Sequence, residues 1–472
     1  MARISLRRIL RNPNPNPSIK DFLLLIFLLL TIFLLRLHHN RPDPLLITTD
    51  PTTTTQVQVD PTALHHLLFS IASSSASLPK RIPYIRLWFD SNTTRAFIFL
   101  DRHLPITSPY IPPIRVSAST TSFPYTFPRG LRSAIRVARI VKEAVELNQK
   151  DVRWFVFGDD DTVFFVDNLV KVLAKYDHDK WYYVGANSES YEQNDKYAFG
   201  MGFGGGGFAI SYGLGRVLAR VLDSCLMRYP HLYGSDSRIY SCLAELGVHM
   251  THEPGFHQVD VRGDLFGMLT SHPLSPLLSL HHLDAIDPIF PKMDRTRALE
   301  HLFKAVNVDP ARILQQTVCY DRSNSITVSV AWGYAVQVHE ANVLLPDLLP
   351  VQRTFRPWRR GKNMSSSRYM FNTRAYFRDP CNRPAVYFFN SVTPSKSGVY
   401  TDYLKHNVGV CSKPDVIQNL KSIRVFSHQQ YLDPEQMKAP RRQCCSISSF
   451  SSNMLVVGIK QCGSDELISM QN

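Results

Sequence analysis

Three consecutive acids follow a short apolar run and form the most distinctive chemical feature of the sequence. The run Trp154–Phe157 leads, one glycine later, to Asp159, Asp160 and Asp161. Three adjacent carboxylates repel one another unless a cation or a helix N-terminus compensates their charge. Hard oxygen ligands suit Mg²⁺ or Mn²⁺, which in turn binds phosphate groups, so the triplet predicts a divalent-metal site. The alternative is a solvated turn in which Asp161 or Asp167 caps the following helix.

A glycine-rich segment lies downstream. Gly204, Gly205 and Gly206 precede the apolar run Phe208–Ser211. The segment matches GxGxxG, but it lacks both the context of a dinucleotide fingerprint and the lysine of a P-loop. Glycines let the backbone approach a ligand closely and adopt positive φ. Because an apolar run follows at once, we expect a structured, ligand-facing turn.

Asp236 stands where a second amphipathic helix is expected to begin. Its apolar stripe is Ile239, Leu243 and Leu246. An aspartate in this position is most often an N-cap. Its place after a glycine-rich loop also makes it a candidate general base.

His257 belongs to a Phe-His pair, and further histidines follow at His272, His281 and His282. A single histidine is more often a packed or hydrogen-bonded residue than a ligand. No HExxH spacing occurs, so the sequence offers no support for zinc hydrolysis.

The elements that must position these residues alternate between strands and helices. Strands are expected at Leu67–Ile71, Ala96–Leu100, Trp154–Phe157 and Trp181–Gly185, and helices at 131–147 and Val166–Tyr176. The first helix should bury Leu131, Ile135, Ala138, Val141 and Val145, with Arg and Lys opposite. Such alternation predicts a parallel-type α/β sheet, whose ligands lie at the carboxyl ends of the strands.

The N-terminal sequence predicts the cellular compartment in which the protein lies. Residues 1–20 are basic and acid-free, and Phe22–Leu35 is apolar except for Thr31. We expect a cytosolic tail at 1–20, a transmembrane signal-anchor at 21–37 and a Pro/Thr-rich stem at 38–62. A cleaved signal peptide is the alternative, because fourteen apolar residues are short for a membrane span. Either way, the bulk of the chain enters the secretory system.

The cysteines fit an oxidising compartment. There are eight, an even number, without a CxxC pair. Cys225 and Cys242 are as well explained by a disulfide as by two buried thiols. Cys444 and Cys445 are neighbours, so each is expected to pair elsewhere. Glycosylation triplets begin at Asn92 and Asn363.

Composition excludes several classes of protein. The 472 residues are 44% hydrophobic and 19% charged, which excludes a disordered, collagen-like, coiled-coil or multi-span membrane protein. The formal charge of +14 would suit nucleic acid, anionic membranes or phosphorylated substrates. The basic, aromatic segment Arg353–Arg360 could bind nucleic acid, but a location in the lumen favours a solvent-exposed face or a contact with the acceptor.

Taken together, the ordered motifs resemble fringe-type glycosyltransferases of the large β-1,3-transferase group. The order is an apolar strand with an Asp-Asp-Asp motif, a strand ending in Val184-Gly185, a glycine-rich turn, an acidic helix start and a Phe-His element. The stretches Ser271–Asp284, Thr317–Ser323 and Val328–Val338 are most similar to a plant fringe-related subfamily. This closer resemblance covers residues 63–445.

The resemblance implies a GT-A-type nucleotide-sugar-binding sheet with flanking helices. It also implies Mn²⁺ (or Mg²⁺) bridging a UDP-sugar donor, with inversion at the anomeric carbon. The resemblance implies that the metal ligands are Asp159, Asp161 and His257 and that the catalytic base is Asp236. It implies donor contacts from Asp159, Asp160, Gly204, Gly205 and Gly206. One departure is Ser237, where related sequences carry a second acid.

The resulting prediction is a Golgi type II membrane enzyme behind a single N-terminal helix. It would comprise a glycosyltransferase domain at 63–308 and a β-rich, cysteine-containing extension at 309–472. It would transfer a hexose or N-acetylhexosamine, through a β-1,3 linkage, to a glycan or glycoprotein acceptor and would bind no nucleic acid. The alternative is a catalytically silent sugar-binding or scaffolding protein on the same fold.

Overall fold

The computed structural model describes residues 26–34, 60–106, 108–272, 275–359, 367–411, 413–439, 443–451 and 453–469. Two compact units comprise residues 1–60 and 61–472. Residues 26–34 are helical; the rest of the predicted anchor, the tail at 1–20, most of the stem and Asn363 lie outside the described residues. Among the residues described, no helix combines the length and apolarity that crossing a membrane requires.

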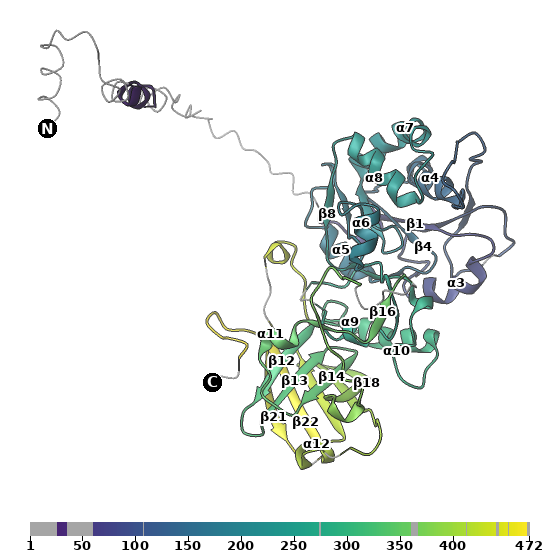
Figure 1. The fold of residues 1–472 in the computed structure, drawn as a ribbon. Coiled ribbons are helices and arrows are strands. Elements are labelled where there is room, and N and C mark those ends of the chain that lie inside the picture. The colour runs from purple at the N-terminus through teal and green to yellow at the C-terminus, as the bar shows by residue number, and fades with distance from the viewer. Residues whose placement is uncertain are drawn as a thin grey trace, which may run out of the picture. The chain divides into compact units, whose positions relative to one another are not determined.

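A seven-stranded mixed sheet forms the first half of the larger unit (Figure 1). Its order is β3-β2-β1-β4-β7-β6-β8. The strands are β1 (Leu67–Ala72), β2 (Ala96–Leu100), β3 (Ile114–Val116), β4 (Trp154–Asp159), β6 (Tyr183–Gly185), β7 (Phe208–Ser211) and β8 (Met250–His252). The predicted parallel arrangement holds for β1 to β4. In contrast, β7 runs antiparallel to both β4 and β6.

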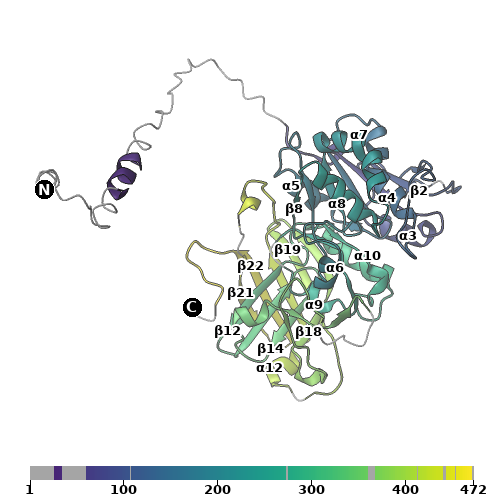
Figure 2. The ribbon, with the colours of Figure 1, turned by 45° about the horizontal axis from the view of Figure 1, so that its top comes forward.

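The two faces of this sheet follow the two-residue period of a strand. Trp154 and Val156 of β4 enter one apolar core, whereas Phe155 and Phe157 enter the other. The second core is covered by α4 (Ser133–Glu146), α7 (Tyr212–Arg228) and α8 (Ser235–Glu245), grouped together in Figures 1 and 2. The first is covered by α3 (Leu78–Ile85) and α5 (Val166–Leu173).

Helix α4 differs from its prediction at both faces. Ile135, Ala138 and Val141 are buried as expected, but Leu131 is 70% exposed because the helix begins only at Ser133. Arg139, expected to face solvent, is buried, and its guanidinium donates to Asp223 of α7 at 2.8 Å. Apolar periodicity could not foresee this, since it depends on the partner helix.

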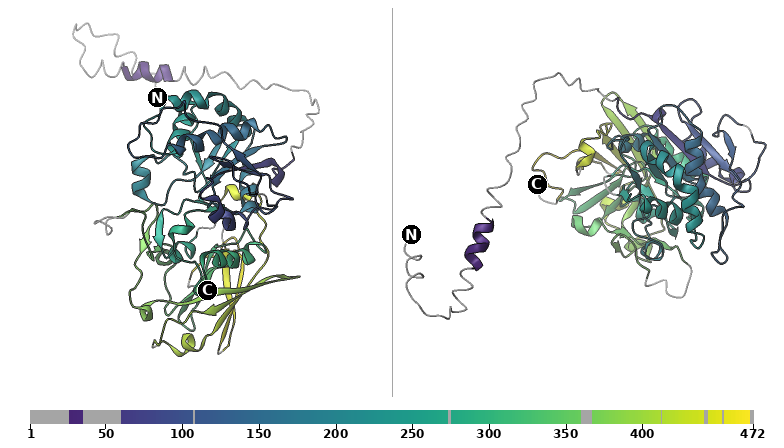
Figure 3. Two further views of the ribbon diagram at one scale, coloured as in Figure 1. Left: turned by 90° about the vertical axis from the view of Figure 1, so that its right-hand side faces the viewer. Right: turned by 90° about the horizontal axis from the view of Figure 1, so that it is seen from above.

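The C-terminal part is β-rich, as predicted (Figures 2 and 3). Its eight-stranded sheet has the order β12-β13-β14-β18-β19-β20-β22-β21. These strands are β12 (Gln316–Asp321), β13 (Ile326–Ala331), β14 (Ala335–His339), β18 (Ala385–Ser395), β19 (Gly398–Lys405), β20 (Ser422–Ser427), β21 (Gln443–Phe450) and β22 (Met454–Gln461). The two outermost strands, β12 and β21, come together and are joined by the disulfide Cys319–Cys445, so the sheet curls on itself.

Further helices and small strand groups lie outside the two large sheets. The helices are α6 (Tyr191–Lys196), α9 (Phe266–Leu269), α10 (Arg295–Val306), α11 (Leu345–Leu348) and α12 (Asp415–Asn419). The strand groups are β5-β11-β9, β10-β16 and β15-β17, with β5 at Val163–Phe164, β9 at Phe256–His257, β10 at Val261–Gly263, β11 at Ser279–Leu280, β15 at Val351–Gln352, β16 at Phe355–Pro357 and β17 at Thr373–Arg374. One apolar core contains Phe69 of β1 as well as Val457 of β22. The proposed boundary at residue 308 is therefore crossed by a continuous core, and the described residues from 61 onward form one unit.

All eight cysteines are paired. Cys225–Cys242 joins α7 to α8, which decides between the two alternatives left open by the sequence. Cys444 pairs with Cys462 and Cys445 with Cys319, so the prediction that these neighbours bond elsewhere is confirmed. Cys381–Cys411 is the fourth bridge.

Candidate active site

The acidic triplet lies at the carboxyl end of β4, where it meets a histidine from a distant segment. Strand β11 (Ser279–Leu280) runs antiparallel to β5 (Val163–Phe164), with Leu280 opposite Val163. This register places His281 beside Asp161. The edge also receives the amino end of the antiparallel strand β7, and hence the glycine-rich loop before it.

Asp159, Asp161 and His281 form a cluster that could hold a metal ion. One ligand atom from each lies within 4.8 Å of the others. The His281 Nε2 atom is 3.1 Å from Asp161 Oδ1 and 3.8 Å from Asp159 Oδ2. Two carboxylates and one imidazole are a donor set that suits Mn²⁺ and accommodates Mg²⁺, so these residues fit the implied metal.

The electrostatics of the cluster differ between its members. Burial would lower the pKa of His281, but the carboxylates of Asp161 and Asp159 outweigh it and raise the pKa to about 9. Burial would raise the pKa of Asp161, yet His281 and Arg81 lower it. Desolvation and the neighbouring acids raise the pKa of Asp159 to about 7; its side chain keeps 42% exposure, which moderates that shift. In the protein alone, a protonated His281 and Arg81 therefore offset the carboxylate charge, and a cation bound here would displace the His281 proton.

The glycine-rich loop separates this cluster from Asp236. A Cβ on Gly205 would lie 2.1 Å from the His281 ring, and a Cβ on Gly204 would lie 2.6 Å from Asp236 Oδ1. Both contacts require glycine. Asp236 and Asp159 also line one cavity of about 20 Å³ together with Gly204, space for about one water. The loop therefore brings the predicted base and the predicted metal ligands to its two sides.

Asp236 is held inside the first turn of α8 rather than at its N-cap, which is Gly234. The backbone N–H of Gly204 and the hydroxyl of Ser235 donate to its carboxylate. Burial raises the pKa of Asp236, and these two hydrogen bonds only partly offset the effect. A carboxylate with a raised pKa is a stronger base than a solvated one.

Asp160 points away from the metal cluster. Its Oδ2 atom accepts from Ser73 Oγ at 2.7 Å and from Ser77 Oγ at 2.6 Å. Both serines follow β1, so Asp160 ties the loop after β4 to the neighbouring strand. Its predicted contact with the donor remains a prediction.

Arg81 is a residue that sequence reasoning missed. Its Nη1 atom lies 2.9 Å from Asp161 Oδ2 and 2.7 Å from Asp284 Oδ2. Without any bound ion, Arg81 therefore offsets part of the negative charge of Asp161 and Asp284. No spacing in the sequence singles it out among 53 lysines and arginines.

His257 lies outside the metal cluster. Its Nδ1 atom is 3.2 Å from Glu189 Oε1, and its Nε2 atom is 3.0 Å from the Nε2 of His272. The metal role that the resemblance implied for His257 stays a prediction, whereas His281 is the histidine that joins the acids. The signal for His281 was the strand-length apolar run Leu277–Leu280 directly before it.

The basic, aromatic segment of the C-terminal extension reaches this site. Strand β16 (Phe355–Pro357) pairs with β10 (Val261–Gly263), and Trp358 then stacks on His282 with ring centres 4.1 Å apart. The Arg262 guanidinium lies 4.1 Å from the same Trp358 ring. His282 is the neighbour of the clustered His281, so the extension forms part of the wall of the site.

Comparisons with known proteins give two family matches within the chain. Residues 62–265 match the family described as Fringe-like, so the chain is related to the fringe-type β-1,3-glycosyltransferases. Residues 193–445, more than half of the chain, match the family described as "Protein of unknown function, DUF604". The chain belongs to this DUF604 family.

Curated relatives share part of the chain. The human protein β-1,3-glucosyltransferase is 29% identical over 158 residues, which is 32% of this chain and 28% of that protein. Its mouse counterpart is 28% identical over 124 residues, 25% of this chain and 23% of that protein. The chain thus spans less than a third of the length of these relatives.

Solved structures give weaker likenesses. One is the catalytic domain of Drosophila β1,4-galactosyltransferase 7 with xylobiose (11% identity, TM-score 0.24, covering 40% of this chain and 64% of that one). Another is the galactosyltransferase LgtC with donor and acceptor sugar analogues (14% identity, TM-score 0.25, covering 42% and 75%). TM-scores at this level do not establish a common fold.

Proposed function

We propose that this protein is an inverting, metal-dependent glycosyltransferase of GT-A type. It would transfer a hexose or N-acetylhexosamine from a UDP-sugar to a glycan or glycoprotein hydroxyl, with a β-1,3 linkage. The observation that carries the proposal is the glycine loop with His281 against Gly205 and Asp236 against Gly204. A base and a site for a phosphate-binding cation thereby lie next to neighbouring glycines of one buried backbone turn.

Each residue has a part in this proposal. Asp236, with its raised pKa, accepts the proton of the acceptor hydroxyl as that oxygen attacks the anomeric carbon. Asp159, Asp161 and His281 would hold Mn²⁺ or Mg²⁺, and such an ion, when bound, neutralises the charge on the departing diphosphate. Gly204, Gly205 and Gly206 let the donor approach the backbone. Attack from the side opposite the leaving group inverts the anomeric configuration.

A Golgi address with the catalytic part in the lumen belongs to the same proposal. The pairing of all eight cysteines supports it, because disulfides persist in oxidising compartments. The exposed Asn92 also fits glycosylation there. We propose that residues 21–37 anchor the chain in the membrane.

The test is UDP release by the full chain with a panel of UDP-sugars. UDP-glucose comes first because the curated relatives are named β-1,3-glucosyltransferases. We expect Mn²⁺-dependent release with one donor in the presence of its acceptor and loss of that release on chelation. Asp236→Asn should lower the rate about 100-fold or more. Asp161→Ala should abolish Mn²⁺-dependent release.

Asp167→Ala is the matched control, because Asp167 is an exposed acid six residues from Asp161 in the first turn of α5. It should retain wild-type release. Release that survives both chelation and the Asp161→Ala change would contradict the metal site. Nucleotide binding without release, across all donors and acceptors, would favour the silent sugar-binding alternative.

A further inference from the structure

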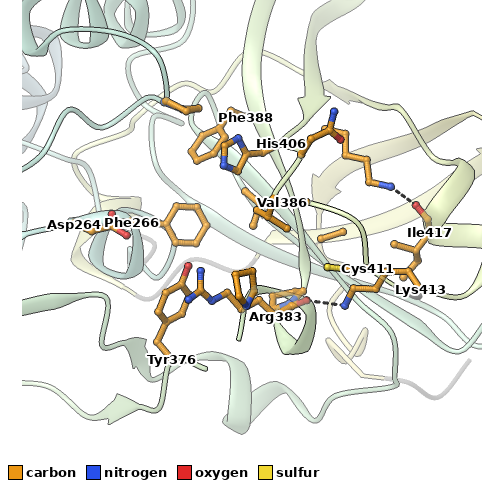
Figure 4. A pocket seen from close by; sticks show the side chains of 18 of the residues that line it. Asp264, Phe266, Tyr376, Arg383, Val386, Phe388, His406, Cys411, Lys413 and Ile417 are labelled. Atoms are coloured by element: carbon orange, nitrogen blue, oxygen red, sulfur yellow. Dashed lines mark hydrogen bonds between the residues drawn. The ribbon is translucent and has the colours of Figure 1, made fainter. Parts of the chain in front are cut away.

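A second pocket lies away from the acidic cluster, in the C-terminal part (Figure 4). Its volume is about 480 Å³, within the range of about 300–1,000 Å³ typical of small-molecule sites. It is bounded by Asp264 and Phe266 near α9, by Phe388 of β18 and by the segment 406–411 after β19. None of the cluster residues, the glycine loop or Asp236 lines it.

Aromatic rings make up much of its wall. The rings of Phe388 and His406 meet at 83° with centres 5.4 Å apart, and Phe266 packs on Phe388 at 5.8 Å. Tyr376 lies opposite, as Figure 4 shows. Aromatic faces carry partial negative charge, which attracts the weakly positive C–H groups of a sugar ring.

The cations at this pocket already have partners. Arg383 lies 4.1 Å from the centre of the Tyr376 ring and donates to the carbonyls of Phe377 and Arg378. Lys413 donates to the carbonyl of Arg383, and Lys405 to that of Ile417 at 2.6 Å. These bonds orient the three side chains, and Lys413 also pairs with Glu340, whereas Arg383 and Lys405 keep their positive charge.

Other polar groups are open to a ligand. Asp264 accepts one hydrogen bond, from the Phe266 backbone N–H to Oδ1 at 2.9 Å, which leaves Oδ2 without a side-chain or backbone donor in the described residues. Within the same residues, the His406 ring and the Asn407 amide have no hydrogen-bond partner. A carboxylate, an imidazole and an amide together match neighbouring hydroxyl groups, each of which can donate and accept.

We propose that this pocket binds a neutral sugar ring of an oligosaccharide, as a glycan-binding site separate from the transfer site. The ring would lie against Phe388, with its hydroxyls on Asp264 and Asn407, while Arg383 covers the Tyr376 ring. The disulfide Cys381–Cys411 ties the lining residue Cys411 to the chain next to Pro380, another lining residue. Such a site would retain a glycan near the enzyme whether or not transfer takes place.

Saccharide binding by the full chain tests this proposal. Ligand-observed NMR would use neutral cello-, xylo-, galacto- and N-acetylchito-oligosaccharides, in a detergent whose head group carries no sugar. We expect one neutral series to bind. Tighter binding of acidic oligogalacturonides than of every neutral series would contradict the proposal, because Arg383, Lys405 and Lys413 would then make the pocket a site for anions. Asp264→Asn and Asn407→Ala should each weaken binding about three- to tenfold, the effect of one hydrogen bond.

Asn390→Ala is the matched control for Asn407→Ala, since Asn390 is an exposed asparagine of β18 outside the pocket. Its saccharide binding should be unchanged, and UDP binding with Mn²⁺ should be unchanged in all three variants. Absence of binding by any neutral series would overturn the proposal. The proposal would also be overturned if the Asp264→Asn and Asn407→Ala variants bound saccharide normally and the Asp236→Asn variant did not, because the sugar would then occupy the transfer site. Loss of UDP binding alone would count against the proposed transferase and not against this pocket.

Discussion

At the scale of single residues, the candidate site depends on His281 lying between two carboxylates. Its side chain is 4% exposed, so neither solvent nor a distant group can substitute for Asp161 and Asp159 as partners. The neighbouring His282 is stacked on Trp358 and its Nδ1 lies 3.2 Å from Asp260 Oδ1. His281 therefore has the position of a ligand, and His282 that of a residue which holds it in place.

We predict that His281→Ala lowers the affinity for Mn²⁺ by at least about 10- to 100-fold. Substitutions of residues that only hydrogen-bond to a metal ligand already have effects of that size. Electron paramagnetic resonance of free Mn²⁺ in a titration measures this affinity. His257→Ala is the comparison, since His257 contacts Glu189 and His272 outside the cluster. Equal losses in both variants would show that His257 is a ligand too.

At the scale of elements, the loop before β7 is the part that separates the base from the metal cluster. Gly207 has φ +88°, a left-handed conformation that favours glycine, and Gly205 faces the His281 ring. Two hydrogen bonds also hold the loop in place: Gly206 N–H donates to Gln258 Oε1 at 2.6 Å, and Thr162 Oγ1 donates to Gly205 O at 2.7 Å. It cannot move aside without breaking these bonds.

We predict that Gly205→Ala displaces His281 and weakens Mn²⁺ binding about tenfold or more, with a smaller effect on thermal stability. The new Cβ would lie 2.1 Å from a buried imidazole whose ring centre is 3.9 Å from that of His282. Gly200→Ala, in the same glycine-rich segment, meets nothing closer than 3.6 Å and should bind Mn²⁺ normally. Normal binding by Gly205→Ala would mean that His281 can move without cost.

At the scale of the whole molecule, a buried ion pair and a disulfide link the start of the C-terminal sheet to its strand β21. Asp309 and Arg312 are buried; Arg312 donates to Gln443 Oε1 at 2.9 Å and to the carbonyl of His428 at 3.0 Å. The Cys319–Cys445 bridge closes a sequence separation of 126 residues across the two outermost strands. Both links act far from the acidic cluster and near the curled sheet.

The Asp309 pair predicts a pH dependence of stability. Burial raises the pKa of Asp309 from 3.8 to about 6, although Arg312 opposes the shift. A raised pKa means that ionisation of Asp309 is less favourable in the folded state than in the unfolded state. The contribution of Asp309 to the free energy of unfolding therefore falls as pH rises from about 4 to about 6. We expect the free energy of unfolding of the wild type, relative to Asp309→Asn, to fall by up to about 3 kcal/mol over that range. Urea denaturation at several pH values measures it; a constant difference would contradict the shift.

The disulfides predict a graded loss of stability. Removing Cys319–Cys445 by a double Cys→Ser change should lower the free energy of unfolding by roughly 5 kcal/mol in the loop-entropy description. Removing Cys444–Cys462, with a separation of 18 residues, should cost roughly 3 kcal/mol. Denaturant unfolding of both variants gives the comparison. The reverse order would indicate that native packing, rather than loop length, decides the effect.

Several features of the protein follow from the sequence by itself. Strands β1, β2, β4 and β6 were predictable to within about two residues because apolar runs of strand length are local signals. The acid triplet at the end of β4 was predictable for the same reason. The β-rich character of the C-terminal part and the separate partners of Cys444 and Cys445 also follow from local composition and spacing.

Only the tertiary structure decided which residues meet. His281 reaches Asp161 through the β5–β11 register, and Trp358 reaches His282 through the β10–β16 pairing, over separations of 120 and 76 residues. The burial of Arg139 and the antiparallel direction of β7 depend in the same way on partner elements. Local patterns determine which segments are strands or helices, whereas the pairing of distant strands depends on packing across the whole core, and no single segment encodes it.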